Sequence, residues 1–290
     1  MHRVDLVWAI DGRGAESPVW DAATGALWFA DLSGGVLYRT DPSGTDRRQW
    51  VLPERVGSFG LCRSGRLVVA LTRTVALFDP ATGDLAPLTG PIDEPAGNRF
   101  NDGKVGPDGA FWVGTRDGRR DAGAVPDGNG CLYRVTADDG LEPKARGYAT
   151  SNGLAWSPDG TVLYHSDSHN GRIDVWDFDP ATGTPSNRRT FATLTSAQGR
   201  PDGAACDVDG HYWSAGISAA RLNRFAPDGR LVDTIDMPCP APTMPCFAGN
   251  DIYVTANARS SADDRFTHHG AGLFRLAAPV AGAPVGVFAD

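Results

Sequence analysis

The chain has 290 residues, of which 41% are hydrophobic and 21% are charged, and its formal net charge is −8. This size and composition suit one folded domain over residues 1–290, and the acidic charge argues against nucleic acid or a membrane surface as partner. The five cysteines form no C-x-x-C pair, and the N-terminus has no apolar signal segment, so we expect a cytoplasmic protein without disulfides or zinc knuckles.

One unit of sequence recurs six times along the chain. Its first half, a Gly-containing turn followed by an apolar strand, occupies residues 19–29, 61–69, 105–113, 154–164, 204–213 and 246–253. Its second half, a strand ending near another turn, occupies residues 36–44, 75–83, 132–140, 175–183, 222–229 and 273–276. Apolar and polar residues alternate with period two, and steps such as Ser64-Gly65 and Asp108-Gly109 suit tight hairpins.

A repeat of about 40 to 50 residues that contains four short strands is typical of a propeller blade. The sequence therefore predicts an all-β, six-bladed β-propeller with four antiparallel strands per blade. We expect the N-terminal strand at residues 4–8 to pair with the C-terminal segment at residues 284–288 and so close the ring.

Equivalent positions in successive blades should face one another across the propeller axis. A step of about a dozen residues back from each strand marker reaches Glu16, Ser58, Asn101, Asn152, Asp202 and residues 242–243. Two carboxylates and an amide oxygen, from Glu16, Asn152 and Asp202, suit a divalent cation. Each position alone would also fit a strand-entry turn, but their matched phase favours a metal site.

The same residues carry a family resemblance over essentially the whole chain. The pattern resembles the SMP-30/gluconolactonase/LRE-like family of six-bladed propeller sugar lactonases, and the matching segments are residues 16–18, 98–103, 112–115, 151–160 and 201–203. The resemblance implies one divalent metal ion, Ca²⁺ or Zn²⁺ foremost and Mg²⁺ or Mn²⁺ as alternatives, bound by Glu16, Asn152 and Asp202. It implies that Asp202 is also the base for water, that Asn101 is a metal ligand or substrate contact, and that Arg99 binds the sugar lactone.

One loop departs from the family pattern. Family members often carry acidic residues shortly after the Gly-Thr step of the third blade, whereas here Thr115 is followed by Arg116, Arg119 and Arg120. If this loop overhangs the channel, Arg119 and Arg120 would bind an anionic group of the substrate. A solvated basic loop is the alternative, and neutral aldonolactones are the default substrates.

Other functions are either disfavoured by the sequence or remain as alternatives to lactone hydrolysis. A Ser-His-Asp hydrolase is disfavoured because no G-x-S-x-G motif occurs and the contiguous residues 167–169 cannot align a triad. His165 and His169 suit structural or surface roles. A metal-dependent phosphotriesterase-like hydrolase would use a similar metal site. A non-enzymatic binding scaffold would not need Glu16 and Asp202, since burial of unpaired carboxylates is costly; a homo-oligomer is possible.

Overall fold

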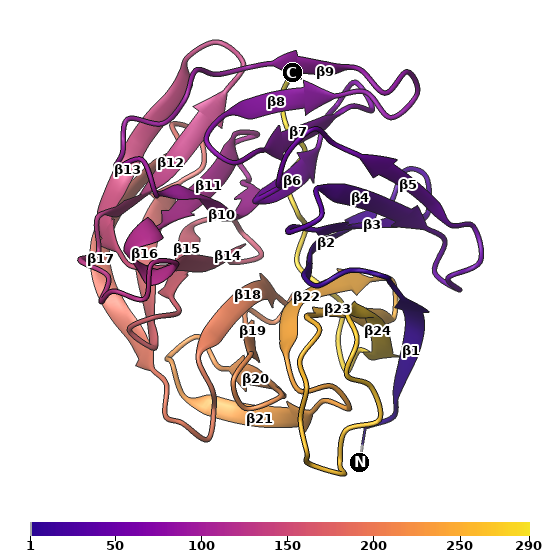
Figure 1. Cartoon of the computed structure of the whole chain (residues 1–290). Coiled ribbons are helices and arrows are strands. Elements are labelled where there is room, and N and C mark those ends of the chain that lie inside the picture. Colours follow the sequence, from indigo (N-terminus) through magenta and orange to yellow (C-terminus); the bar gives the residue numbers. More distant parts are fainter. Residues whose placement is uncertain (1) are drawn as a thin grey trace.

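Six four-stranded antiparallel sheets stand around a central axis (Figure 1), which confirms the predicted six-bladed propeller. The computed structural model describes residues 2–290, apart from the side chain of Arg120. From the axis outward, the first three blades are β2 (Ala15–Asp21), β3 (Ala26–Asp31), β4 (Val36–Thr40), β5 (Arg48–Val51); β6 (Ser58–Leu61), β7 (Leu67–Ala70), β8 (Val75–Phe78), β9 (Leu85–Pro87); and β10 (Arg99–Val105), β11 (Phe111–Arg116), β12 (Gly130–Thr136), β13 (Gly140–Tyr148).

The second half of the ring repeats this order. Its blades are β14 (Ser151–Trp156), β15 (Val162–Asp167), β16 (Arg172–Asp179), β17 (Thr184–Thr193); β18 (Pro201–Cys206), β19 (Tyr212–Gly216), β20 (Arg221–Phe225), β21 (Leu231–Asp236); and β22 (Pro242–Ala248), β23 (Asp251–Ala256), β24 (Gly272–Ala277), β1 (Val4–Ala9). A short 3-10 turn, η1 (Gly118–Arg120), lies between β11 and β12. Within the described residues, no helix has the length and apolar character needed to cross a membrane.

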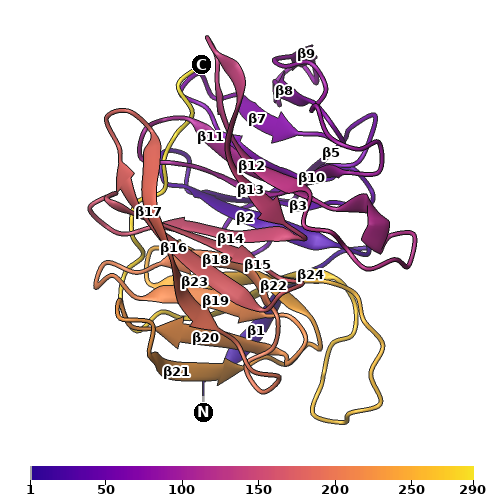
Figure 2. The ribbon, with the colours of Figure 1, turned by 90° about the vertical axis from the view of Figure 1, so that its left-hand side faces the viewer.

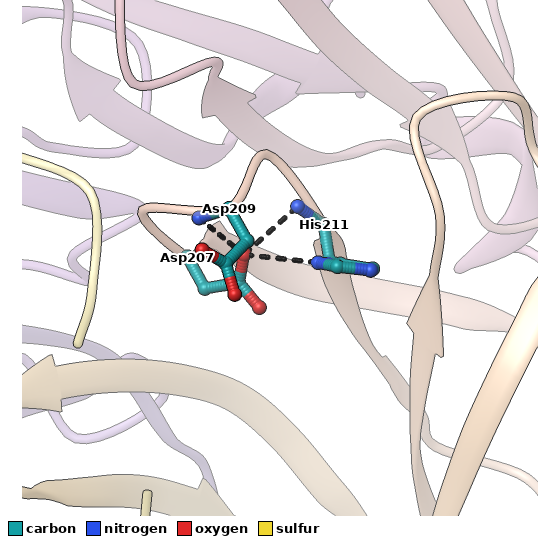
Figure 3. A group of neighbouring side chains, drawn as sticks. All are labelled: Asp207, Asp209 and His211. Atoms are coloured by element: carbon teal, nitrogen blue, oxygen red, sulfur yellow. Dashed lines mark hydrogen bonds and ion pairs between the residues drawn. The ribbon is translucent and has the colours of Figure 1, made fainter. Parts of the chain in front are cut away.

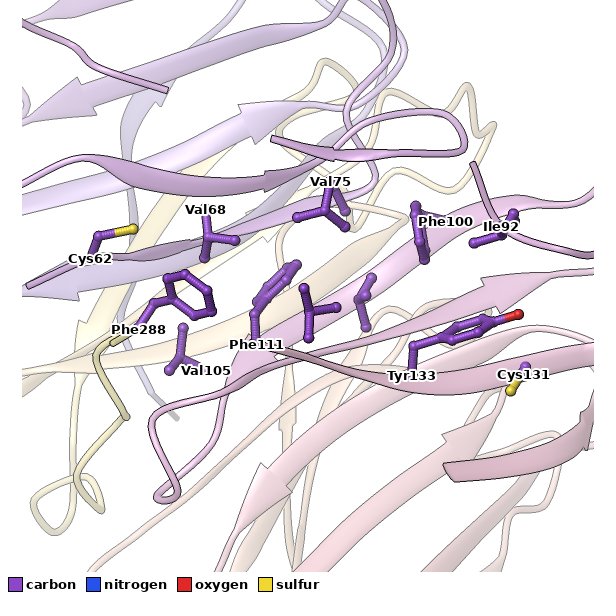
Figure 4. Packing of buried hydrophobic residues seen from close by; sticks show 13 residues of the cluster. Cys62, Val68, Val75, Ile92, Phe100, Val105, Phe111, Cys131, Tyr133 and Phe288 are labelled. Carbon is purple, nitrogen blue, oxygen red and sulfur yellow. The ribbon is translucent and has the colours of Figure 1, made fainter. Parts of the chain in front are cut away.

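The core lies between neighbouring blades rather than in one central mass. Every residue of β3 and β7 is buried, whereas most of the outermost strand β17 is exposed. Figure 4 shows the cluster between the second and third blades, where Phe111 and Val68 pack with Phe288 from the C-terminal segment. Because inner strands are covered on both faces, they appear in the sequence as nearly continuous apolar runs.

The N-terminal strand closes the ring as predicted, but its expected pairing with residues 284–288 is wrong. Strand β1 pairs with β24, with Val4 opposite Leu276 and Ala9 opposite Gly272, so the last free edge of the sixth blade is already occupied. Residues 283–286 instead lie against the ends of the inner strands, and Phe288 donates its N–H to the carbonyl of Leu61 at 2.8 Å. The C-terminal segment thus crosses the ring and runs along one face of it (Figures 1 and 2).

Candidate functional site

Five of the six inner strands carry a β-bulge close to their first residues. In β2, Glu16 lies opposite Ala30 and Val19 lies opposite Trp28, so three steps on one strand match two on its partner. The same irregularity interrupts β10, β14, β18 and β22. A bulge turns side chains away from the regular alternation of a strand. The segments that could be interpreted as strand-entry turns are therefore bulges inside strands.

The bulges bring the predicted axial residues to one cavity of about 290 Å³. Glu16, Asn101, Asn152 and Asp202 all line it, and this volume is near the lower end of small-molecule sites, roughly 300 Å³. The residues matched in blade position are thus together in space. Ser58, the corresponding residue of the second blade, is fully buried and is not part of the lining.

Hydrogen bonds join the cavity residues of three successive blades. The Asn101 amide donates to Asn152 Oδ1 at 3.1 Å, and the Asn152 amide donates to Asp202 Oδ1 at 2.6 Å. The Asn152 amide also donates to the hydroxyl of Ser168 at 2.7 Å. Since Asn152 and Asp202 are almost completely buried, these bonds fix the orientation of both side chains.

Three carboxylates face the same cavity. Burial, and then the charges of Asp202 and Asp102, raise the pKa of Glu16 well above its ordinary value, while a hydrogen bond from Thr243 opposes the rise. Burial likewise raises the pKa of Asp102, and the nearby Lys104 opposes this. Carboxylate and amide oxygens held around an excess of negative charge are a donor set that fits a divalent cation.

Five arginines supply the opposite charge on the cavity lining, namely Arg55, Arg99, Arg116, Arg200 and Arg259. Arg99 was predicted from the sequence, whereas Arg55, Arg200 and Arg259 were not. Arg200 nevertheless stands two residues before Asp202, as Arg99 stands two residues before Asn101, so the repeat carried a signal for it. Arg55 and Arg259 come from irregular segments between strands.

Arg119, one of the two arginines predicted to bind an anion, is not among the described residues that line the cavity. Arg119 forms an ion pair with Asp127, and about half of its side chain is exposed. A role of Arg119 in substrate binding therefore stays a prediction. Arg120 was the second residue of this prediction, and its side chain lies outside the described residues.

A second group of possible metal ligands, Asp207, Asp209 and His211, lies on the turn between β18 and β19 (Figure 3). Asp207 already accepts the backbone N–H groups of Asp209 and His211, at 3.1 and 2.9 Å. Its other oxygen accepts hydrogen bonds from Trp213 Nε1 at 2.9 Å and Arg224 at 2.7 Å. Burial alone would raise the pKa of Asp207, but these donors hold it below its usual value.

The third blade repeats this arrangement without a histidine. Asp108 accepts a hydrogen bond from Trp112 Nε1 at 3.1 Å and one from Arg134 at 2.8 Å. An Asp-Trp-Arg unit that recurs in two blades is a way of fixing a turn to its sheet. Asp207 therefore has a structural role, and the axial cavity is the better candidate for a metal site.

The buried serine–histidine pair does not form a nucleophilic site. Ser151 Oγ lies 2.6 Å from His165 Nε2, and both residues are fully buried. Burial lowers the pKa of His165 to about 3, so its imidazole is neutral. Neither residue lines the cavity, which agrees with a structural role for His165; His169 is exposed on the turn that follows.

Comparison with known proteins identifies relatives of this propeller. The family model described as SMP-30/Gluconolactonase/LRE-like region matches residues 14–258. Over 250 residues the chain is 40% identical to 6-deoxy-6-sulfogluconolactonase of Pseudomonas putida, an alignment that covers 83% of this chain and 82% of the relative. It is 33% identical over 264 residues to L-arabinolactonase of Azospirillum brasilense, with 89% and 86% covered.

A solved structure agrees with these matches. The structure of regucalcin from Agrobacterium tumefaciens, described as a calcium-binding protein, superposes with a TM-score of 0.86 at 26% identity and covers 100% of this chain and 97% of that one. The family match and the sequence identities confirm the resemblance found in the sequence. The chain belongs to the SMP-30/gluconolactonase/LRE-like family, in which the relatives named as lactonases are carboxylic-ester hydrolases.

Proposed function

We propose that this protein hydrolyses a sugar lactone to the corresponding aldonic acid, with a divalent metal ion bound by Glu16, Asn152 and Asp202. The observation that carries the proposal is the convergence of these three oxygen donors, from three blades, in one cavity. The names of two relatives, a sulfogluconolactonase and an arabinolactonase, support a sugar lactone as substrate. The calcium-binding description of regucalcin supports Ca²⁺, and the donors would also accept Zn²⁺, Mg²⁺ or Mn²⁺.

The proposed reaction adds water to the lactone carbonyl and breaks the ring C–O bond. When bound, the metal ion would polarise the carbonyl and acidify a water molecule. Asp202 would accept the proton from the attacking water and return it to the departing ring oxygen. Its carboxylate is fixed for this role by the 2.6 Å hydrogen bond from Asn152.

The other cavity residues would bind and orient the substrate. The Asn101 amide donates one hydrogen bond to Asn152 Oδ1 and another, at 2.8 Å, to the carbonyl of Ser151. Arg99 lines the same wall and would donate hydrogen bonds to the hydroxyl groups of the sugar. In this proposal these two residues position the lactone, and only Asp202 exchanges a proton with it.

The test is acid release from a panel of aldonolactones by metal-stripped protein to which Ca²⁺, Mg²⁺, Mn²⁺ or Zn²⁺ is added back. We expect metal-dependent hydrolysis well above the spontaneous rate. Asp202→Asn should lower kcat by about 10²- to 10⁴-fold, the usual contribution of a general base, without loss of folded structure. Asp228→Asn, on an exposed turn of the same blade, is the matched control and should retain activity.

Three outcomes would count against the proposal. Wild-type turnover by Asp202→Asn would remove this residue from the mechanism. Hydrolysis of a phosphotriester but of no lactone would favour the phosphotriesterase-like alternative. No hydrolysis of either class by folded protein with any of the four metals would favour a non-enzymatic scaffold.

A further inference from the structure

Acidic and basic residues divide the cavity lining by depth. The carboxylates of Asp102 and Asp202 are at most 7% exposed, whereas Arg55 and Arg200 are exposed residues of the same lining. The two most buried charges of the lining are thus negative, and the two most exposed are positive. A metal ion would neutralise the buried negative charge, but of the five arginines the proposed reaction of a neutral lactone uses only Arg99.

Three of the arginines form one group on the side of the second and third blades. Arg99 and Arg116 contact different oxygens of the same carboxylate, Asp121, and their side chains are only 14% and 18% exposed. Asp121 thereby holds two guanidinium groups beside each other. Arg55 adds a third positive charge and, among the described residues, forms no salt bridge. One carboxylate therefore faces three cations.

The lowered pKa of Arg55 agrees with this excess of positive charge. Burial, and then the positive charge of Arg99, lower the pKa of Arg55, and the charges of Asp121 and Asp31 oppose the effect. A guanidinium that is disfavoured by a like charge gains most from an additional anion. The forked donors of arginine match the oxygens of sulfonate, phosphate and carboxylate groups.

The remaining two arginines lie elsewhere in the cavity. Burial and the charge of Arg200 lower the pKa of Arg259, whereas the charge of Asp202 opposes this, so this pair lies within reach of the proposed base. Arg259 also donates to the carbonyl of Ile217 at 2.8 Å. This pair is therefore associated with Asp202 in the fifth blade, whereas Arg99 and Arg116 are held by Asp121 in the third blade.

We propose that the substrate is a lactone that carries an anionic group distant from its ring carbonyl, and that Arg55, Arg99 and Arg116 bind this group. The inference rests on the proposed lactonase function and specifies its substrate class. Sulfonate, phosphate and carboxylate share the required chemistry. The anion recognition that the sequence suggested for Arg119 and Arg120 is thus assigned to Arg116 from the same loop and to two arginines outside that loop.

The test compares kcat/KM for glucono-1,5-lactone with kcat/KM for its 6-deoxy-6-sulfo, 6-phospho and 6-carboxylate analogues. Wild-type protein should prefer at least one anionic lactone by about 100-fold or more, the value of one or two charged hydrogen bonds. Arg55→Ala should reduce that preference by about tenfold, mainly through KM. Arg48→Ala removes an exposed arginine of the outer strand β5 and is the matched control, so its preference should equal that of the wild type.

Binding provides a second measurement that does not depend on turnover. Calorimetric titration of the 6-sulfonated aldonic acid, the reaction product, should show weaker binding to Arg55→Ala than to the wild type or Arg48→Ala. The three anionic lactones distinguish the possible groups, because the best substrate identifies which anion the site accepts.

The outcomes separate this inference from the proposed function. Efficient hydrolysis of the neutral lactone, with no gain from any anionic group, would overturn the inference and leave the lactonase function standing. An anionic preference that Arg55→Ala leaves intact would overturn the assignment to this group of arginines. If no lactone of either kind is hydrolysed with any metal, the proposed function fails and the inference fails with it.

Discussion

Replacing Glu16 by glutamine should have opposite effects on the metal-free and the metal-bound protein. Glu16 shares the cavity with two other acids, and its pKa is raised by burial and by the charges of Asp202 and Asp102. Glutamine has nearly the same shape and retains one carbonyl oxygen, but it carries no charge. The substitution should therefore stabilise the metal-free protein and weaken metal binding.

The sign of the pH dependence follows from the raised pKa. Below the ordinary glutamate pKa of about 4.3, the side chain is protonated in the folded and the unfolded protein, so its ionisation does not affect stability. Above the raised folded-state pKa, ionisation in the fold is unfavourable, and stability is lost as the pH rises through that value. The gain from glutamine is thus absent at low pH and complete at alkaline pH.

The magnitudes are large enough to measure. Each tenfold difference in acidity between the folded and unfolded states corresponds to about 1.4 kcal/mol, and 1 kcal/mol moves Tm by about 2–4 °C in a chain of this order of size. For the wild type, metal at 100 times Kd adds about 2.7 kcal/mol to the free energy of unfolding. A variant with hundredfold weaker affinity would gain only about 0.4 kcal/mol at the same concentration.

Scanning calorimetry at pH 8, with chelator and then with CaCl₂, checks this prediction. Glu16→Gln should unfold at a higher temperature than the wild type in chelator and should show a much smaller shift with calcium. Glu142→Gln, whose partly exposed side chain pairs with Lys144 on an outer strand, is the control and should follow the wild type. A Glu16→Gln protein that is less stable in chelator, or that keeps the full calcium shift, would refute the reasoning.

Two further substitutions test the bulge and the C-terminal segment. Gly153 has φ of +63° and would place a Cβ 2.5 Å from two buried hydroxyl oxygens, whereas Gly25 at φ of +65° has open space around it. Gly153→Ala should therefore lower the free energy of unfolding by about 1–3 kcal/mol more than Gly25→Ala does. It should also weaken metal binding, because Asn152 is the neighbouring residue. Equal losses of stability for the two variants in urea unfolding would contradict this. Phe288→Ala should lower the free energy of unfolding by about 3–5 kcal/mol, whereas Val287→Ala, which is 42% exposed, should lower it by about 0.5 kcal/mol; similar urea midpoints would show that the C-terminal segment does not stabilise the ring.

The repeated unit was sufficient to predict the blades because each blade is a local structure. In the first five blades the strands follow one another directly, most of them joined by short turns, so the order along the chain is also the order in the sheet. The pairing of the chain ends is not local. Residues 284–288 have a strand-like sequence pattern, but the edge of β24 that they could join is occupied by β1. Phe288 instead packs in the apolar cluster between the second and third blades.

The axial residues were predictable for the same reason, and the bulges explain which neighbours were missed. A step of one position per blade finds a single residue in each inner strand. In a regular strand the adjacent residue would point to the other face, but in the bulge of β10 both Asn101 and Asp102 line the cavity. Arg200 could have been found from the repeat, because it stands two residues before Asp202 as Arg99 stands two residues before Asn101. Arg55 lies in an irregular segment before β6, where no period indicates the direction of a side chain.

The acidic and basic residues of the cavity make metal binding and substrate binding depend on each other. Without a cation, Glu16, Asp102 and Asp202 place negative charge in the cavity, and an anionic lactone that reaches the arginines must approach that charge. A divalent cation removes most of this repulsion while the arginines stay in place. Because coupling between two ligands is reciprocal, a substrate that binds more tightly to the metal-loaded protein must also tighten metal binding by the same factor. The arginines would therefore act on metal affinity without touching the metal, and only when the lactone is charged.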